Sequence, residues 1–134
     1  MEHPSITPTE IVGELSRRFL AGNRDGAMAL LSPDLLIEQP PSLPHGGEHR
    51  GHDGMAAMGA AFAEHWDRVI VDPRLVADGA TVVQLTTQTW TARTTGRAVT
   101  VDVVELLTVA DGRITEIRVF PQDTASLLAT LDPL

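Results

Sequence analysis

The chain of 134 residues contains no cysteine, no lysine and no tyrosine; all ten of its basic residues are arginines. These absences exclude a disulfide framework, a thiolate nucleophile, a lysine Schiff base and a phenolic acid. The five serines lie outside any nucleophile-elbow sequence, which argues against a Ser-His-Asp hydrolase. Any chemistry must therefore use carboxylates, imidazoles, amides, guanidiniums or water.

Other absences concern partners, cofactors and location. The formal net charge of -8 argues against binding to nucleic acid or to an anionic membrane surface. Glycine motifs for dinucleotides and for P-loop phosphates are missing, so no cofactor is expected. No apolar run approaches the roughly 18 residues of a membrane span. Residues 1–10 lack a secretory signal pattern, and a cytoplasmic location is expected.

Apolar residues make up 43% of the chain, enough for a proper core, and the length fits one domain over residues 1–134. The abundance of arginine, alanine and glycine, together with the lack of lysine, hints at a high-GC bacterial source.

The first half of the chain is predicted to be mostly helical. Thr7-Pro8-Thr9-Glu10 has the pattern of a capping box, and the helix that it starts should end near residues 21–23. A short helix over 25–31, a strand over 35–38 and a loop over 42–51 should follow. Asp53 is expected to cap a third helix, and Met55, Met58, Phe62 and His65 would share one of its stripes.

The second half is predicted to be a meander of strands. Asp78-Gly79 and Asp111-Gly112 are strong hairpin signals, and Thr95-Gly96 is a weaker one. The resulting strands are 66–77, 80–93, 97–110 and 113–120, followed by a short helix capped by Asp123. The expected fold is α+β: a cone-shaped, curved antiparallel sheet wrapped around the N-terminal helices, with a small-molecule pocket at its open end.

Strand 97–110 places one carboxylate on an apolar face. Glu105 lies in the middle of this face, whose other members are Val99, Val101, Val103, Leu107 and Val109. Burial among valines should raise the pKa of Glu105, as in a general acid that works near neutral pH. The alternative is a Glu at the strand edge that pairs with an arginine.

Aromatic and amide side chains share a face of strand 80–93. Gln88 and Trp90 would suit an apolar ligand with a polar handle, although a Trp packed under a helix is the commoner arrangement. His65-Trp66 lies where the third helix meets the sheet, at the expected pocket wall. A lone histidine there is more often structural than a base.

Three histidines, His45, His49 and His52, lie in the glycine-rich loop before the third helix. Their spacing matches no strong metal-ligand pattern, so no metal is expected. A metal-dependent site on this loop remains a third, less favoured hypothesis. The loop is more readily interpreted as a pocket rim that could donate one histidine to a ligand.

Several segments, in this order, resemble the SnoaL-like polyketide cyclase and ketosteroid isomerase group of the nuclear transport factor 2-like (NTF2-like, cystatin-like) superfamily. They are Arg18-Phe19, residues 29–34 running into residues 36–40, residues 50–54, residues 101–107 and residues 111–114. The resemblance covers nearly the whole chain. It implies the fold described above, proton-transfer chemistry without a cofactor and a homodimer formed through the outer face of the sheet.

The resemblance carries over only in part at the level of single residues. Steroid isomerases of the group place a base carboxylate where this chain has Gln39, and a tyrosine near Phe19. Only their second, protonated acid has a counterpart, at Glu105. Two of three catalytic groups are therefore absent, which argues against ketosteroid isomerisation by that mechanism.

The sequence thus favours a cofactor-independent isomerase or cyclase acting on a small, largely apolar polyketide-, steroid- or terpenoid-like compound. The alternative is a non-catalytic ligand-binding or dimerisation module. The residues expected to take part in catalysis are Glu105, His65 and Gln39. The residues expected to line the pocket are Phe19, Met58, Phe62, Trp66, Gln88, Trp90, His45 and His52.

Overall fold

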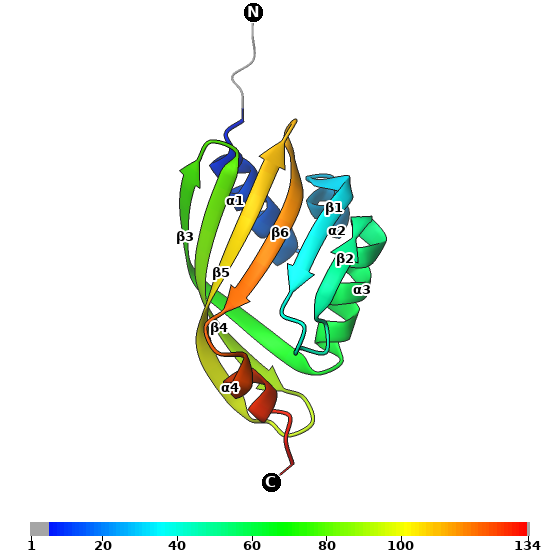
Figure 1. Cartoon of the computed structure of the whole chain (residues 1–134), viewed down its shortest axis with the longest axis vertical. Coiled ribbons are helices and arrows are strands. Elements are labelled where there is room, and N and C mark those ends of the chain that lie inside the picture. Colours follow the sequence, from blue (N-terminus) through cyan, green and yellow to red (C-terminus); the bar gives the residue numbers. More distant parts are fainter. Residues whose placement is uncertain (1–5, 134) are drawn as a thin grey trace, which may run out of the picture.

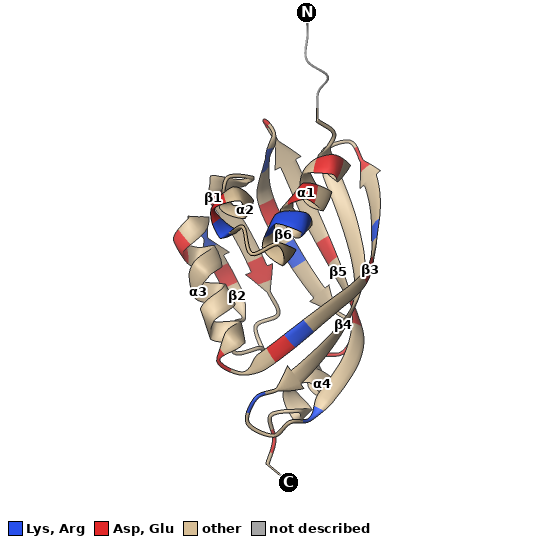
Figure 2. Cartoon of the chain, turned by 180° about the vertical axis from the view of Figure 1, so that it is seen from behind, with Lys and Arg blue, Asp and Glu red and all other residues tan. Residues whose placement is uncertain are grey.

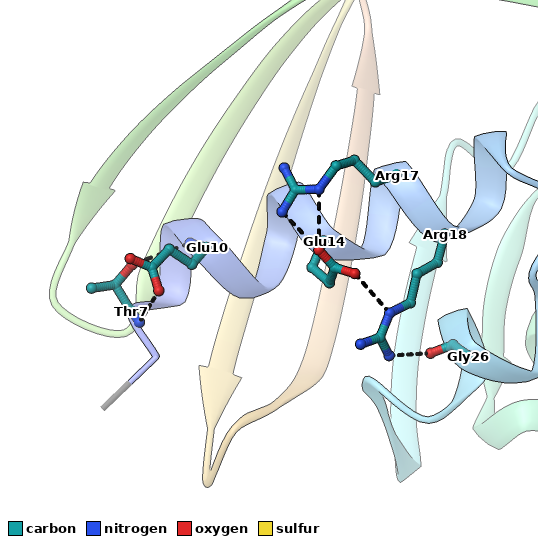
Figure 3. Close-up of polar contacts among 6 residues, drawn as sticks. All are labelled: Thr7, Glu10, Glu14, Arg17, Arg18 and Gly26. Carbon is teal, nitrogen blue, oxygen red and sulfur yellow. Dashed lines mark hydrogen bonds and ion pairs between the residues drawn. The ribbon is translucent and has the colours of Figure 1, made fainter. Parts of the chain in front are cut away.

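The computed structural model describes residues 6–133, and its first element is helix α1, Pro8–Leu20. The capping box is confirmed: the Thr7 hydroxyl accepts from the Glu10 amide, and the Glu10 carboxylate accepts from the Thr7 amide. Figure 3 shows this cap, and further along the helix Arg18 bridges Glu14 to the carbonyl of Gly26. The bridge ties α1 to the short helix α2, Arg24–Met28.

The segment between α2 and the third helix contains more strand than the sequence predicted. Strand β1 covers Leu31–Gln39, including Pro33, because an irregularity in the register between Leu31 and Leu36 accommodates the proline. The predicted loop over 42–51 ends in a short strand, β2, Gly47–Arg50, which pairs antiparallel with β1. This strand was missed because it is a four-residue edge strand beginning in a glycine pair.

Helix α3, Gly51–Ala63, begins two residues before the predicted cap. The prediction that Asp53 caps it is wrong: Arg50 occupies the N-cap position, without a side-chain bond. Asp53 lies instead in the first turn, where its charge favours the helix dipole.

The four predicted long strands are confirmed to within one residue. They are β3 (Trp66–Asp78), β4 (Thr81–Ala92), β5 (Ala98–Ala110) and β6 (Arg113–Pro121). The positive φ angles of Asp111 (52°) and Gly112 (74°) are those of a tight hairpin turn of the predicted kind. Helix α4, Thr124–Ala129, follows, and the Asp123 carboxylate caps it by accepting from the Ser126 amide, as predicted.

All six strands form one sheet in the order β2-β1-β6-β5-β4-β3. The sheet is mixed rather than wholly antiparallel, because β1 and β6 run parallel. It is also open, since β2 and β3 are its two edges. Figure 1 shows the long strands sweeping in a curve past α1, with α3 beside β1 and β2 and with α4 at the far end. The α+β fold with a curved sheet around helices is confirmed.

The core lies on the concave side of the sheet in two clusters. The larger one packs α1 residues such as Ile11, Val12 and Leu15 against β1, β5 and β6. The second cluster gathers Trp66, Trp90 and Leu127 where α4 covers the sheet. Among residues 6–133, no helix is long and apolar enough to cross a membrane.

Candidate active site on the concave face

The strand register defines which side chains point into the concave face, because directly paired residues lie on the same side of a sheet. Glu105 pairs with Gln84 on β4 and with Val119 on β6, so it lies on the inner side with the core. Arg68 on β3 pairs with the buried Trp90, and Ile70 with the buried Gln88, which places them on the inner side too. Figure 2 views the molecule from the side on which α1 and α3 lie in front of the sheet.

Glu105 is the only charged residue on the inner face of β5, between the buried Val103 and Leu107. Desolvation by the surrounding protein raises its pKa, and the positive charge of Arg68 partly opposes that rise. Within residues 6–133, its carboxyl group makes no hydrogen bond, and the residue is only partly buried. Its raised pKa favours the protonated form, and a small molecule could reach the group.

Arg68 provides a positive charge on the same face, and the sequence interpretation overlooked it. Its guanidinium lies over the ring of Phe62, 4.6 Å from the ring centre. Although β3 is an exposed edge strand, nearby protein desolvates the guanidinium and lowers the pKa of Arg68, while Glu105 raises it. The sequence spacing could have revealed it: Arg68 is two residues after Trp66, so both side chains lie on the same face of the strand.

His45 lies in a cluster of rings, not on an open rim. Its ring centre is 5.3 Å from that of Phe62, 5.9 Å from Trp66 and 5.8 Å from Trp90. Its side chain is buried, and its Nδ1 atom has no hydrogen-bond partner within the described residues. Desolvation, with smaller effects of nearby positive charge, lowers the pKa of His45 to about 4. The imidazole is therefore neutral at physiological pH.

The two tryptophans belong to satisfied hydrogen-bond networks. The Trp66 indole donates to the Thr130 hydroxyl at 2.8 Å, so Trp66 packs under the end of the chain that carries α4. The Trp90 indole donates to the Gln88 carbonyl at 2.8 Å, and the Gln88 amide donates to the Thr86 hydroxyl at 3.0 Å. Gln88 is itself buried, so these bonds hold its side chain within the core.

The other expected site residues occupy different parts of the molecule. Glu38 on β1 pairs with Arg118 on β6, so the next residue, Gln39, lies beside Val119. Val119 in turn pairs with Glu105 on β5. The amide nitrogen of Gln39 contacts the Met58 sulfur at 3.4 Å. Phe19 continues the inward stripe of α1 and is 38% exposed. His65 lies beside Trp66, which pairs with Ala92 at one end of β4. Glu105 pairs with Gln84 toward the other end of β4, so His65 and Glu105 lie at different ends of that strand.

The three loop histidines have separate surroundings. His49 bonds through Nε2 to the carbonyl of His45, and His52 bonds through Nε2 to the carbonyl of Leu31. Among the residues that the structure describes, no group of three His, Asp or Glu side chains is arranged to hold a metal ion.

Two surface hollows lie away from the charged groups of the inner face. One, of about 430 Å³, lies between β5 and α4, and the other, of about 300 Å³, lies beside the start of α3. His52 lines the second, so this predicted pocket residue is placed apart from Glu105. Neither hollow includes Glu105 or Arg68. The case for a site on the inner face therefore rests on its polar groups and on partly exposed apolar residues such as Phe19 and Ile70.

Solved structures share this architecture. The chain is 27% identical to an NTF2-like protein from Burkholderia xenovorans LB400, with a TM-score of 0.84 over 93% of this chain and 95% of that one. A Xanthomonas campestris protein with a cystatin-like fold is 23% identical, with a TM-score of 0.81 over 96% and 100% of the two chains. A candidate polyketide cyclase from Pseudomonas putida KT2440 is 17% identical, with a TM-score of 0.79 over 96% and 100%. The fold is therefore NTF2-like.

The sequence profile of the SnoaL-like domain matches residues 12–117. The chain therefore belongs to the SnoaL-like domain family, as its resemblance implied. No curated protein matches the chain significantly.

Proposed function

We propose that the protein is a cofactor-independent isomerase or cyclase that uses Glu105 for general acid-base chemistry on a small, largely apolar carbonyl compound. The observation that carries the proposal is the position of Glu105: a solvent-reachable carboxyl group without a hydrogen-bond partner among residues 6–133, on an apolar inner face that raises its pKa. A carboxyl group that exchanges its proton near neutral pH can serve as both acid and base.

In the proposed reaction, ionised Glu105 takes a proton from the carbon next to the substrate carbonyl, which leaves an enolate. The Glu105 carboxylic acid then returns the proton at another carbon, or to the oxygen formed when the enolate carbon attacks a second carbonyl. Gln39, on β1 and separated from β5 by β6, would orient the substrate oxygen. His65 is too closely associated with Trp66 to be assigned a step.

Hydrogen–deuterium exchange tests this proposal without knowledge of the natural substrate. The α-protons of 2-tetralone in D2O, followed by NMR, should exchange faster with the wild-type protein than without it. Glu105→Gln should lower the catalysed rate by about 100-fold or more, the usual contribution of a general acid-base group. Asp102→Asn, on the same strand but facing outward, is the matched control and should keep the rate.

The alternative function is a non-catalytic binding module of the same fold. Binding of 2-tetralone with no enhanced exchange would favour that alternative, because the site would then hold a ligand without moving its proton.

We also propose that the chain forms a homodimer through the outer face of the sheet. Val69, Val71 and Phe120 point outward and remain 44% to 62% exposed. Light scattering should give twice the chain mass of 14.4 kDa. Phe120→Glu should produce the monomer, and a monomeric wild-type protein would contradict the proposal.

A further inference from the structure

The inner face carries a cation that the proposed acid-base chemistry does not use. Arg68 stacks on Phe62 and lies close enough to Glu105 and His45 to shift the pKa of both. Within residues 6–133, however, its guanidinium has neither a hydrogen bond nor an ion pair. Five other arginines pair with carboxylates on the surface: Arg17, Arg18, Arg50, Arg93 and Arg118. Arg24, Arg74 and Arg113 also have no ion pair within residues 6–133, but of these unpaired arginines only Arg68 lies over an aromatic ring.

The acidic residues near Arg68 in the sequence or in space leave its charge uncompensated. Asp67 alternates to the other side of β3 and pairs with Arg93 at 2.8 Å. Glu105 is the one carboxylate that influences the pKa of Arg68, yet it forms no ion pair with it and its own pKa is raised. Within residues 6–133, no carboxylate therefore forms an ion pair with Arg68.

Arg68 is exposed on the edge strand, so a ligand can reach its guanidinium, and the fork of N–H donors matches a carboxylate or an enolate oxygen. Phe62 holds the guanidinium in place, and Ile70 on the same strand and face offers apolar surface beside it. Arg68 and Glu105 influence each other's pKa without forming an ion pair within residues 6–133, so each can contact a ligand.

We propose that Arg68 is a binding subsite for an ionised oxygen, so that the inner face takes organic anions in which a carboxylate or enolate adjoins an apolar ring or chain. This inference rests on the proposed function and narrows its substrate class. Arg68 would fix the charged end of the ligand, while Glu105 would act on the atoms next to it.

A pair of matched probes tests the inference. 2-Naphthoate and 2-naphthamide have the same apolar ring system and differ in charge. Calorimetry should show that the wild-type protein binds the carboxylate at least about tenfold more tightly than the amide, since a hydrogen bond to a charged group contributes on the order of 1.5–3 kcal/mol. The indole N–H signal of Trp90, which is paired with Arg68, should shift in the NMR spectrum and so locate the site.

Variants then assign the preference to Arg68. Arg68→Gln should remove the preference for the carboxylate while amide binding is kept, and Arg68→Lys should retain part of it. Arg74→Gln is the matched control, because Arg74 lies on the same strand but pairs with the outward-facing Leu85. Circular dichroism checks that each variant is folded, and the comparison of the two probes on the wild-type protein needs no variant.

The outcomes separate the two proposals. Equal binding of both probes to the wild-type protein, or an unchanged preference in Arg68→Gln, would overturn the anion subsite and leave the acid-base proposal standing. An equal loss in Arg74→Gln would also overturn it, because the effect would then be one of overall charge. If neither probe binds, both the subsite and the apolar ligand site are contradicted.

Discussion

The aromatic cluster (His45, Phe62, Trp66 and Trp90) and the charged pair (Arg68 and Glu105) occupy the same concave face and differ in how their polar groups are satisfied. Both indole N–H groups of the cluster donate to protein oxygens at 2.8 Å. Arg68 and Glu105 have no such partner within residues 6–133. Arg68 is exposed and Glu105 is only partly buried, so their charged groups are open to a ligand, whereas both indole N–H groups are already bonded within the core.

The largest expected change is in the free energy of unfolding when a residue of the aromatic cluster is removed. Trp66→Ala should lower the free energy of unfolding by about 3–5 kcal/mol, because it leaves a cavity and removes the N–H that donates to the Thr130 hydroxyl. Phe19→Ala, at a side chain that is 38% exposed, should cost about 1 kcal/mol or less. Urea denaturation measures both, and a similar loss in the two variants would break the distinction.

The second prediction concerns His45, the one cluster member with an unsatisfied atom. Its folded pKa of about 4 lies below its ordinary value of 6.5, so the unfolded chain binds the proton more tightly. The stabilising effect of a neutral His45 is thus complete above about pH 6.5 and is lost as pH falls toward 4. This loss should amount to up to about 3 kcal/mol.

Substitution of His45 isolates that contribution from the other acid-sensitive groups. Neither His45→Phe nor His45→Gln has a side chain at this position that can bind a proton. Each variant should therefore lose less stability than the wild-type protein between pH 7 and pH 4, as measured by urea denaturation. An identical loss in the wild type and both variants would show that His45 does not titrate in a buried site.

The smallest expected effect lies at the helix that covers the cluster. Asp123→Ala removes the cap of α4 and should cost about 1 kcal/mol of stability. Asp123→Asn retains an acceptor oxygen and should cost less. If thermal unfolding gave equal losses for the two variants, the cap would not be the source of the effect.

Much of the fold could be predicted from the sequence because its signals are local. The hairpin residues Asp78-Gly79 and Asp111-Gly112 and the cap residues Thr7 and Asp123 act within a few positions of the chain. The parallel pairing of β1 with β6 could not be predicted, since it joins distant segments through backbone bonds that leave little trace in the side-chain pattern. The edge strand β2 was missed because it is only four residues long.

The candidate site was predicted less completely. Strand alternation was enough to place Glu105 among buried valines, and the register confirms that placement. His45 and Arg68 were harder, because the loop and the exposed edge strand that carry them show no periodic apolar pattern. The burial of His45 and the effect of Arg68 on its pKa arise from tertiary packing, which brings the loop against Phe62, Trp66 and Trp90.

The central claim is that burial on the inner face raises the pKa of Glu105, and carboxyl NMR titration of the wild-type protein against Glu105→Gln tests it most directly. The account predicts a resonance, absent from the variant, with a pKa above the ordinary value of 4.5. The folded state would then bind this proton more tightly than the unfolded chain, so the stability it contributes is present below about pH 4.5 and lost as pH rises. Glu105→Gln should accordingly be the more stable protein at pH 8 but not at pH 4. A pKa of Glu105 at its ordinary value, with no gain in stability at pH 8, would contradict the account.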